Sequence, residues 1–230
     1  MSDVLTYTLE DGVATLRMDD GKANAFSSDM FEIVNAALDK AETEAKIVVL
    51  RGKAGIFSGG YDLKELMLGG DTATQLVRKG SELAIRIMEF PKPVIAVGDG
   101  HIVALGGFLF LAADYRIGLN GAYQVGLPET AKGLPMHNFG RELASYKLNP
   151  RYFSRSFING EMFAPDASVD VGFLDVATDD VDQAINDAVA FFKSISLAAF
   201  TINKPRGYQT VLPVLKQATE DDMAIRVPGQ

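Results

Sequence analysis

Two short runs of apolar residues, each preceded by a helical stretch, constrain the fold of this chain more than any other feature of its sequence. The runs are Ile47-Val48-Val49-Leu50 and Val94-Ile95-Ala96-Val97. Neither run alternates with polar residues, so each predicts a strand buried on both faces of a sheet. Because a helical stretch lies between the two strands, the chain can cross over, and the strands are expected to pair in parallel. The sequence therefore predicts an α/β fold.

The helices beside these strands are predicted from apolar residues at helical spacing. Ser27 or Ser28 offers an N-cap for the first helix. The apolar stripe of this helix comprises Met30, Phe31, Val34, Ala37, Leu38 and Ala41. The second helix is expected to end before Pro91 and Pro93. Its stripe comprises Leu76, Val77, Leu83, Ala84, Ile87 and Met88.

The chain is expected to open with a hairpin, because Leu5–Glu10 and Val13–Met18 flank Asp11-Gly12, a pair that suits a tight turn. Residues 108–113 fit a buried helix or a strand by periodicity, and Gly106-Gly107 before them favours a loop that enters a helix.

From Asn138 onward the sequence is mainly helical, with a boundary expected near residues 177–182. We therefore divide the chain into a core of residues 1–176, which carries the candidate site, and a helical C-terminal region of residues 177–230. Apolar residues of this region that a neighbouring subunit could cover include Val189, Phe192 and Phe200.

Composition excludes several classes of function. The chain has 230 residues, 47% of them hydrophobic, which is enough for one sizeable core. It has no cysteine and only two histidines, so neither disulfides nor a metal site is predicted. The formal net charge of -8 opposes binding to nucleic acid.

The sequence also predicts a cytoplasmic protein without a membrane partner. Residues 1–7 carry the acidic Asp3 and lack a basic segment followed by an apolar core, so no secretory signal is expected. The longest strongly apolar stretch, residues 102–113, is too short to span a bilayer.

Three segments carry residues that suit a ligand site. The first, Phe57-Ser58-Gly59-Gly60-Tyr61-Asp62-Leu63-Lys64, is a glycine-rich turn in which a ligand can approach backbone amides. A tight strand-to-helix connection capped by Asp62 explains the same pattern. The second, residues 98–107, places small residues before an apolar helix, whose first amides suit an oxyanion or a phosphate. Close packing of a buried helix is the alternative.

The third segment, Val125-Gly126-Leu127-Pro128-Glu129, places a carboxylate after apolar residues and a proline. If this carboxylate is poorly hydrated, desolvation raises its pKa and makes it a better base near neutral pH. A solvated loop glutamate is the alternative.

Taken in order along the chain, these segments resemble the crotonase (enoyl-CoA hydratase/isomerase) superfamily. The resemblance also includes Lys22-Ala23-Asn24-Ala25-Phe26-Ser27, Pro91-Lys92-Pro93-Val94 and residues 160–175. It covers roughly three quarters of the chain, as for a single unit of ordinary domain size.

The resemblance implies a crotonase-like spiral of repeated β-β-α units with a C-terminal helical region that assembles homotrimers or hexamers. By position, the backbone N–H groups of Tyr61 and Leu105 would form an oxyanion hole. The coenzyme A path would be lined, chiefly through backbone groups, by Lys22, Ala23, Ser58, Gly60, Asp62 and Leu63. Lys22 and Lys64 are candidates for contacts to the coenzyme A phosphates, with solvated surface lysines as the alternative.

The chain departs from the hydratase pattern at one position. Hydratases of the superfamily resemble Gly-Gly-Gly-Cys-Glu in the second segment. Counting back from Asp114-Tyr115-Arg116-Ile117 puts Phe108 at the position of that glutamate. Glu129 matches the other hydratase carboxylate, and a lone glutamate there is similar to the pattern of mitochondrial-type Δ3,Δ2-enoyl-CoA isomerases. The resemblance therefore favours an isomerase.

The resulting hypothesis is an acyl-CoA enzyme that isomerises 3-enoyl-CoA to 2-enoyl-CoA. Glu129 would act as the base, with no cofactor beyond the coenzyme A moiety of the substrate. One alternative is an enoyl-CoA hydratase, or another enolate enzyme, whose second polar group comes from elsewhere. Another is a non-catalytic acyl-CoA-binding protein. For His101 and His137 a structural role is favoured over contact with the substrate.

Overall fold

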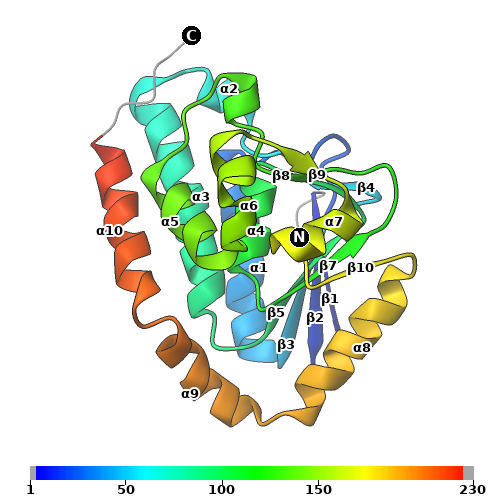
Figure 1. Cartoon of the computed structure of the whole chain (residues 1–230). Coiled ribbons are helices and arrows are strands. Elements are labelled where there is room, and N and C mark those ends of the chain that lie inside the picture. Colours follow the sequence, from blue (N-terminus) through cyan, green and yellow to red (C-terminus); the bar gives the residue numbers. More distant parts are fainter. Residues whose placement is uncertain (1–3, 225–230) are drawn as a thin grey trace.

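The computed structural model describes residues 4–224, whose strands form two sheets (Figure 1). The strands are β1 Leu5–Glu10, β2 Val13–Met18, β3 Ile47–Arg51, β4 Gly55–Ser58, β5 Val94–Gly98, β6 Gly100–Val103, β7 Tyr115–Leu119, β8 Val125–Gly126, β9 Met162–Phe163 and β10 Val176–Thr178. One sheet has the order β1-β2-β3-β5-β7-β10 and the other β4-β6-β8-β9. The pairs β1·β2 and β8·β9 are antiparallel, and the other pairs are parallel.

The helices follow the strands in a repeating order. They are α1 Ser28–Glu44, α2 Leu63–Leu66, α3 Gly70–Glu89, α4 Leu105–Ala112, α5 Asn138–Lys147, α6 Pro150–Phe153, α7 Pro165–Val171, α8 Val181–Ser194, α9 Leu197–Gly207 and α10 Val211–Met223. A 3₁₀ turn spans Thr130–Lys132 and a π-helical turn spans Ser154–Ile158. The successive groups β1-β2-α1, β3-β4-α2-α3 and β5-β6-α4 confirm the predicted repetition of β-β-α units.

Local signals determine where the first elements begin and end. Asp11 and Gly12 have φ values of 48° and 76°, as the tight turn between β1 and β2 requires. The Ser27 side chain accepts a hydrogen bond from the Met30 N–H and caps α1. The predicted hairpin and first helix are therefore confirmed.

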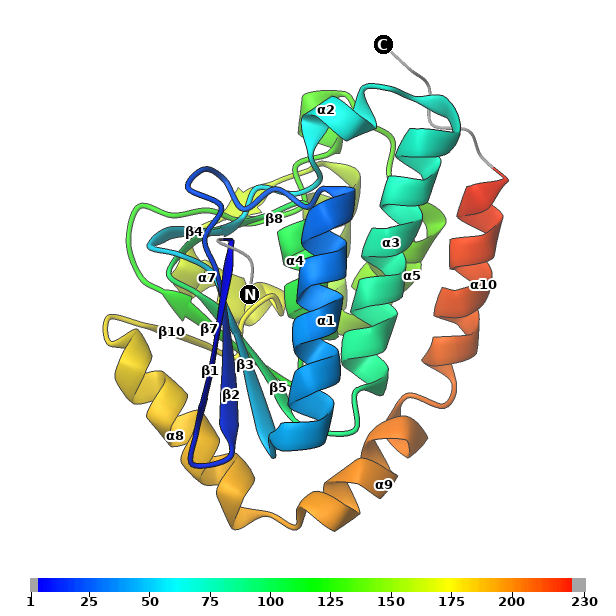
Figure 2. The same cartoon turned by 180° about the vertical axis from the view of Figure 1, so that it is seen from behind.

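The two central strands β3 and β5 are buried on both faces, as predicted. Val48 and Leu50 of β3 belong to the core that includes residues of α1, α3 and α4. Ile47 and Val49 point to the opposite face and pack in a second core with α8. In Figure 2, α8 lies on one side of the sheet and α1 and α3 lie on the other.

The C-terminal helices turn back over the body of the chain. In both views α10 runs beside α3 and α5, and it contacts both helices. The predicted boundary after residue 176 falls within β10, which pairs with β7. Residues 1–3 of the predicted core and 225–230 of the predicted C-terminal region lie outside the described residues.

Among residues 4–224, no single helix is long and apolar enough to cross a membrane. The pair α8 and α9, bent by 98°, meets those criteria only when its two helices are taken together.

Several strands differ from the sequence prediction. β4 occupies part of the first glycine-rich segment, and β6 lies between Asp99 and Ala104 in the second. Both strands are four residues long and contain glycine, so they carry no clear alternation of apolar and polar residues. The run beginning at Phe108 is part of helix α4, as predicted.

Candidate active site

The loop before α1 is bound to the end of β4. Asn24 is fully buried, and its Nδ2 donates to the carbonyl oxygens of Met18 at 3.0 Å and Phe57 at 3.1 Å. The Gly59 N–H donates to the Ala23 carbonyl at 2.8 Å. The first glycine-rich segment and the residue 20–24 loop therefore lie side by side, as the predicted coenzyme A path requires.

Ser58 connects the same two segments through its side chain. Its hydroxyl donates to the Asn24 carbonyl at 2.8 Å and accepts from the Gly60 N–H at 3.1 Å. The Ser58 side chain is buried, so it contributes to the shape of the turn and leaves backbone groups at the surface of the site.

The backbone at Tyr61 pairs with Phe26, and this pairing leaves the Tyr61 N–H pointing away from Phe26. Phe26 donates its N–H to the Gly60 carbonyl at 2.8 Å and accepts from the Asp62 N–H at 3.0 Å. In such a parallel bridge the flanking residues make both bonds, so the Tyr61 N–H points to the other side. Within residues 4–224 this N–H has no hydrogen-bond acceptor.

The start of α4 lies on that other side. Ala104, which precedes the helix, has φ 55° and ψ -121°, a conformation that non-glycine residues rarely adopt and that is concentrated at functional sites. A Cβ added to Gly60 would lie 2.9 Å from the Ala104 Cβ and 3.8 Å from the Leu105 nitrogen. The Leu105 N–H likewise has no acceptor among the described residues. The two unpaired amides, of Tyr61 and Leu105, therefore belong to touching backbone segments.

A cavity of about 390 Å³ opens beside these segments. Its walls come from α2, α3, α10 and the chain between residues 128 and 138. Of the predicted site residues, it is lined by Gly59 of the first segment together with Tyr61, Leu63 and Glu129. Apolar side chains, including Leu66, Val77 and Met136, make up much of the remaining wall.

Glu129 brings a poorly hydrated carboxylate to this cavity. Its Oε2 is buried and has no hydrogen-bond partner within the described part of the chain. Burial raises the pKa of Glu129 to about 7, although its own backbone N–H and Lys132 act in the opposite direction. Of the two alternatives that the sequence leaves open, a poorly hydrated carboxylate and a solvated loop glutamate, the buried Oε2 favours the first.

The second carboxylate in the cavity wall, Asp222, was not found by sequence reasoning. It accepts hydrogen bonds from the backbone and side-chain nitrogens of Asn138 at 2.7 and 2.8 Å and from the Phe139 N–H at 2.9 Å. These bonds cap the start of α5. The Asp222 carboxylate is therefore occupied by hydrogen bonds to α5. Of the two described carboxylates that line the cavity, Glu129 is the one with an unpaired oxygen.

Phe108 fills its position with an apolar ring. It is 1% exposed, and its ring centroid lies 5.2 Å from that of His137 and 6.5 Å from that of Phe139. The position that the resemblance matches to the second hydratase glutamate is therefore apolar in this chain.

Both histidines have the structural roles that the sequence favours. His101 Nδ1 accepts from the Gln124 N–H at 3.1 Å, and its ring packs on Tyr123. His137 Nδ1 accepts from the Gly140 N–H at 2.8 Å and caps α5. Unlike His101, His137 also lines the cavity.

The other predicted coenzyme A residues include a helix cap, a cavity-lining leucine and two exposed lysines. Asp62 caps α2 by accepting from the Lys64 N–H at 2.8 Å and the Glu65 N–H at 3.1 Å. Leu63 is 64% exposed. The side chains of Lys22 and Lys64 are exposed and do not line the cavity.

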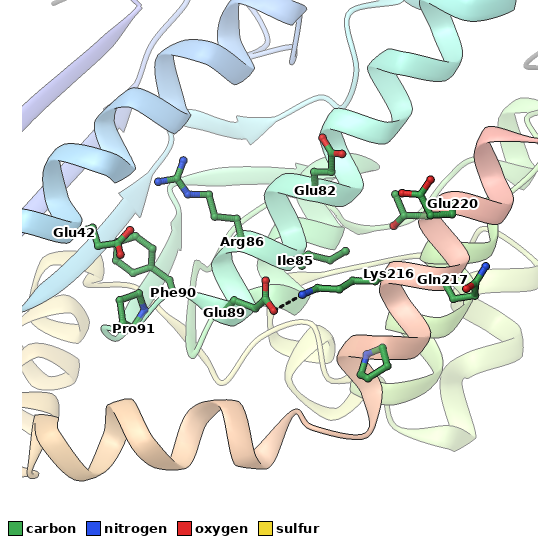
Figure 3. Close-up of a pocket in the computed structure, with 12 residues that line it drawn as sticks. Glu42, Glu82, Ile85, Arg86, Glu89, Phe90, Pro91, Lys216, Gln217 and Glu220 are labelled. Atoms are coloured by element: carbon green, nitrogen blue, oxygen red, sulfur yellow. Dashed lines mark hydrogen bonds and ion pairs between the residues drawn. The ribbon is translucent and has the colours of Figure 1, made fainter.

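A second, more open hollow of about 580 Å³ lies between α3 and α10 (Figure 3). Its wall carries several charged residues, and Glu89 Oε1 lies 2.6 Å from Lys216 Nζ across it. Thr219 of α10 lines both hollows. Within residues 4–224, no group of His, Cys, Asp and Glu side chains is arranged to hold a metal ion.

Comparison with known proteins identifies the family. The family model described as enoyl-CoA hydratase/isomerase matches residues 8–219. The chain belongs to this family. A crystal structure of an enoyl-CoA hydratase/isomerase family protein from Pseudomonas syringae is 42% identical, with a TM-score of 0.94 over 96% of this chain and 97% of that one.

Curated relatives of this crotonase carry two kinds of name. The probable enoyl-CoA hydratase of Bacillus subtilis is 29% identical over 93% of this chain and 82% of the relative. The mitochondrial enoyl-CoA delta isomerase 1 of Rattus norvegicus is 26% identical over 93% of this chain and 74% of the relative. The predicted superfamily and crotonase fold are therefore confirmed, and the choice of reaction depends on the site.

Proposed function

We propose that the cavity binds an acyl-CoA thioester and that the chain isomerises 3-enoyl-CoA to 2-enoyl-CoA with Glu129 as the base. One observation carries this proposal. Glu129 presents an unpaired, buried oxygen to the cavity, whereas Phe108 occupies the position of the second hydratase carboxylate. Isomerisation requires one base that removes and returns a proton, while hydration also requires a group that activates water.

In this mechanism the thioester oxygen accepts hydrogen bonds from the backbone amides of Tyr61 and Leu105. Glu129 removes a proton from C2, and the electron pair moves into the enolate that these amides stabilise. The protonated Glu129 then delivers the proton to C4, so the double bond moves from C3–C4 to C2–C3. An oxyanion donor typically contributes about 3 kcal/mol to stabilising such a transition state.

The pKa of about 7 suits Glu129 to this exchange, since a base works best when its pKa lies near the operating pH. The mechanism uses no cofactor besides the coenzyme A moiety of the substrate. Backbone groups of Ala23, Ser58, Gly60, Asp62 and Leu63 would line the path of that moiety.

The phosphates of coenzyme A would meet Lys22 and Lys64, two exposed lysines from the segments that the Gly59 N–H and the Ala23 carbonyl join. A double charge reversal, Lys22→Glu with Lys64→Glu, should weaken coenzyme A binding at low salt, where such contacts are least screened. Unchanged affinity would remove these lysines from the proposal.

Incubation with 3-enoyl-CoA in heavy-oxygen water tests the reaction. We expect 2-enoyl-CoA without label, and the variant Glu129→Gln should lose at least about 10²-fold in turnover while it still binds acyl-CoA. Full turnover by Glu129→Gln would show that another group is the base.

Two other outcomes correspond to the alternatives. Labelled 3-hydroxyacyl-CoA would identify a hydratase, the activity in the name of the Bacillus subtilis relative. Tight binding without turnover across a panel of thioesters would identify a non-catalytic acyl-CoA-binding protein.

We also propose a homotrimer, alone or paired into a hexamer. Phe192 is only 4% exposed and is covered by the chain's own sheet, so it does not contribute to this argument. Phe191 of α8 and Ile202 of α9 are 55% and 53% exposed and offer apolar surface to a neighbour. A monomer in sedimentation at micromolar concentration would contradict the assembly.

A further inference from the structure

The imidazole of His137 in the cavity wall has no role in the proposed reaction. His137 lines the cavity, and its Nδ1 accepts a hydrogen bond from the Gly140 N–H at 2.8 Å. A neutral imidazole that accepts at Nδ1 carries its proton on Nε2. Within residues 4–224, Nε2 has no hydrogen-bond partner, so it is a donor without an acceptor.

The packing of the ring determines which edge faces the cavity. A Cβ added to Gly140 would lie 2.8 Å from His137 Cε1 and 3.0 Å from Nδ1, so this edge lies against the backbone of α5. The rings of Phe108 and Phe139 lie beside the imidazole, with centroids 5.2 and 5.9 Å away. The edge formed by Nε2 and Cδ2 is the one left to the cavity.

His137 is a donor rather than an acid or a base. The charged group that faces it, Asp222, lies 4.0 Å from Nδ1 but accepts its hydrogen bonds from Asn138 and Phe139. Protonation of Nδ1 would break the bond to the Gly140 N–H. Burial lowers the pKa of His137, which agrees with a neutral ring, although Asp222 acts in the opposite direction.

We propose that His137 determines substrate specificity by donating its Nε2–H to an oxygen atom on the acyl chain, a hydroxyl or a carbonyl. The inference rests on the proposed binding of acyl-CoA in this cavity. A plain hydrocarbon chain would cover the Nε2–H without offering an acceptor, and leaving a buried donor unsatisfied is costly. The preferred substrates are therefore oxygenated 3-enoyl-CoA thioesters.

The test compares saturated acyl-CoA ligands of equal length, one plain and the others with a hydroxyl moved one carbon at a time along the chain. In the natural protein, at least one hydroxylated ligand should bind about 10-fold more tightly than the plain one. The matched variant is His137→Asn. Its side-chain oxygen can still cap α5, but it is too short to carry a donor to the place of Nε2. Its preference should fall to about 1-fold.

A second measurement uses the unsubstituted protein. In ¹⁵N-histidine spectra, the Nε2 resonance of His137 should shift with the preferred hydroxylated ligand and much less with the plain one. Equal shifts for both ligands would overturn the proposal, as would equal affinities in the natural protein or an unchanged preference in His137→Asn.

These ligands require no turnover, so the outcome is separate from the proposed isomerase reaction. A hydroxyl preference without isomerase activity would leave this inference standing and remove the reaction. Isomerase activity without a preference for hydroxylated ligands would support the reaction and overturn the inference about His137. Failure of every thioester to bind would overturn both.

Discussion

The hydroxyl oxygen of Tyr61 lies where a side chain on Gly80 would begin. A Cβ on Gly80 would fall 2.2 Å from Tyr61 Oη, which donates to the Val77 carbonyl at 3.3 Å. Burial raises the pKa of Tyr61, with Glu129 and Asp222 adding to the effect, so the phenol stays a donor. Because the backbone of Tyr61 carries one of the two unpaired amides, the packing of its ring against α3 positions that amide.

Gly80→Ala should therefore disturb both stability and the site. The alanine raises helix propensity by about 1 kcal/mol, but the clash should exceed this gain and lower the free energy of unfolding by about 1–3 kcal/mol. Acyl-CoA binding should weaken as Tyr61 moves. Urea denaturation and a binding titration check both effects.

The matched control is Gly207→Ala in α9, where an added Cβ meets nothing within 4 Å. Tyr61→Phe removes the closest clashing atom, so Gly80→Ala combined with Tyr61→Phe should lose less than the sum of the single changes. Additive losses would mean that Tyr61 is not the source of the clash.

The pH dependence of turnover should report the ionisation of Glu129. A base must be deprotonated, so kcat/KM for a 3-enoyl-CoA should rise with pH up to about 7 and then level off. A rate that stays flat from pH 5 to pH 8 would contradict the assignment of this carboxylate as the base.

The ionisation of Glu129 should also change the free energy of unfolding. Turnover should rise with pH, whereas the free energy of unfolding should fall. The folded state holds the Glu129 proton up to about pH 7 and the unfolded state only up to its ordinary value near 4.5, so the natural protein loses stability as pH rises between them. Glu129→Gln lacks this loss. Relative to the natural protein, the variant should therefore gain about 1–3 kcal/mol between pH 4 and pH 8. Denaturant titrations at several pH values measure this gain, and a constant difference would refute it.

The helices and strands that were predicted correctly are those specified by residues close to one another in the sequence. The stripe of α1 and the Asp11-Gly12 turn each depend on neighbouring residues, and both are confirmed. The four-stranded sheet was missed because its strands are short, and β8 and β9 have only two residues each. Their pairing depends on partners distant in sequence.

The residues of the candidate site also fall into those suggested by local sequence and those whose roles depend on partners distant in the chain. Glycine and proline in the local sequence marked Glu129 and the two glycine-rich segments as candidates, but each had a structural alternative, and their roles came from the order of the segments, which resembles the superfamily. Asp222 was not found, since its role depends on α10 returning to α5, more than eighty residues earlier in the chain. The orientation of His137 likewise depends on the Gly140 amide and on Phe108, which no local pattern reveals.

Asp222→Ala tests how α10 closes the cavity. The change removes the acceptor of three hydrogen bonds at the start of α5, so the free energy of unfolding should fall by about 1–3 kcal/mol. Acyl-CoA binding should weaken, because Asp222 and its neighbour Met223 line the cavity. The control Asp221→Ala removes an exposed carboxylate whose one side-chain hydrogen bond within residues 4–224 is to Gln217 of its own helix. Equal effects of the two changes would show that the cap does not hold α10.

The ion pair between Lys204 and Asp114 should be the most costly pair to break by a single substitution. Lys204 Nζ lies 2.6 Å from Asp114 Oδ2, and the two side chains are 3% and 8% exposed. Burial lowers the pKa of Lys204 and raises that of Asp114, so their attraction does not fully offset the cost of desolvation. Lys204→Met leaves a buried carboxylate unpaired and should lower the free energy of unfolding by about 3–5 kcal/mol at neutral pH.

A second substitution separates the loss of the pair from the loss of packing around Lys204. Asp114 also accepts from the Val94 N–H at 2.9 Å, and an asparagine keeps that acceptor without the charge. Lys204→Met combined with Asp114→Asn should therefore recover most of the stability that Lys204→Met loses. Lys193→Met, which breaks the exposed pair with Asp11, should change little, because such pairs are well solvated. If the double variant is as unstable as Lys204→Met alone, the cost lies in the packing of α9 against the body and not in an unpaired charge.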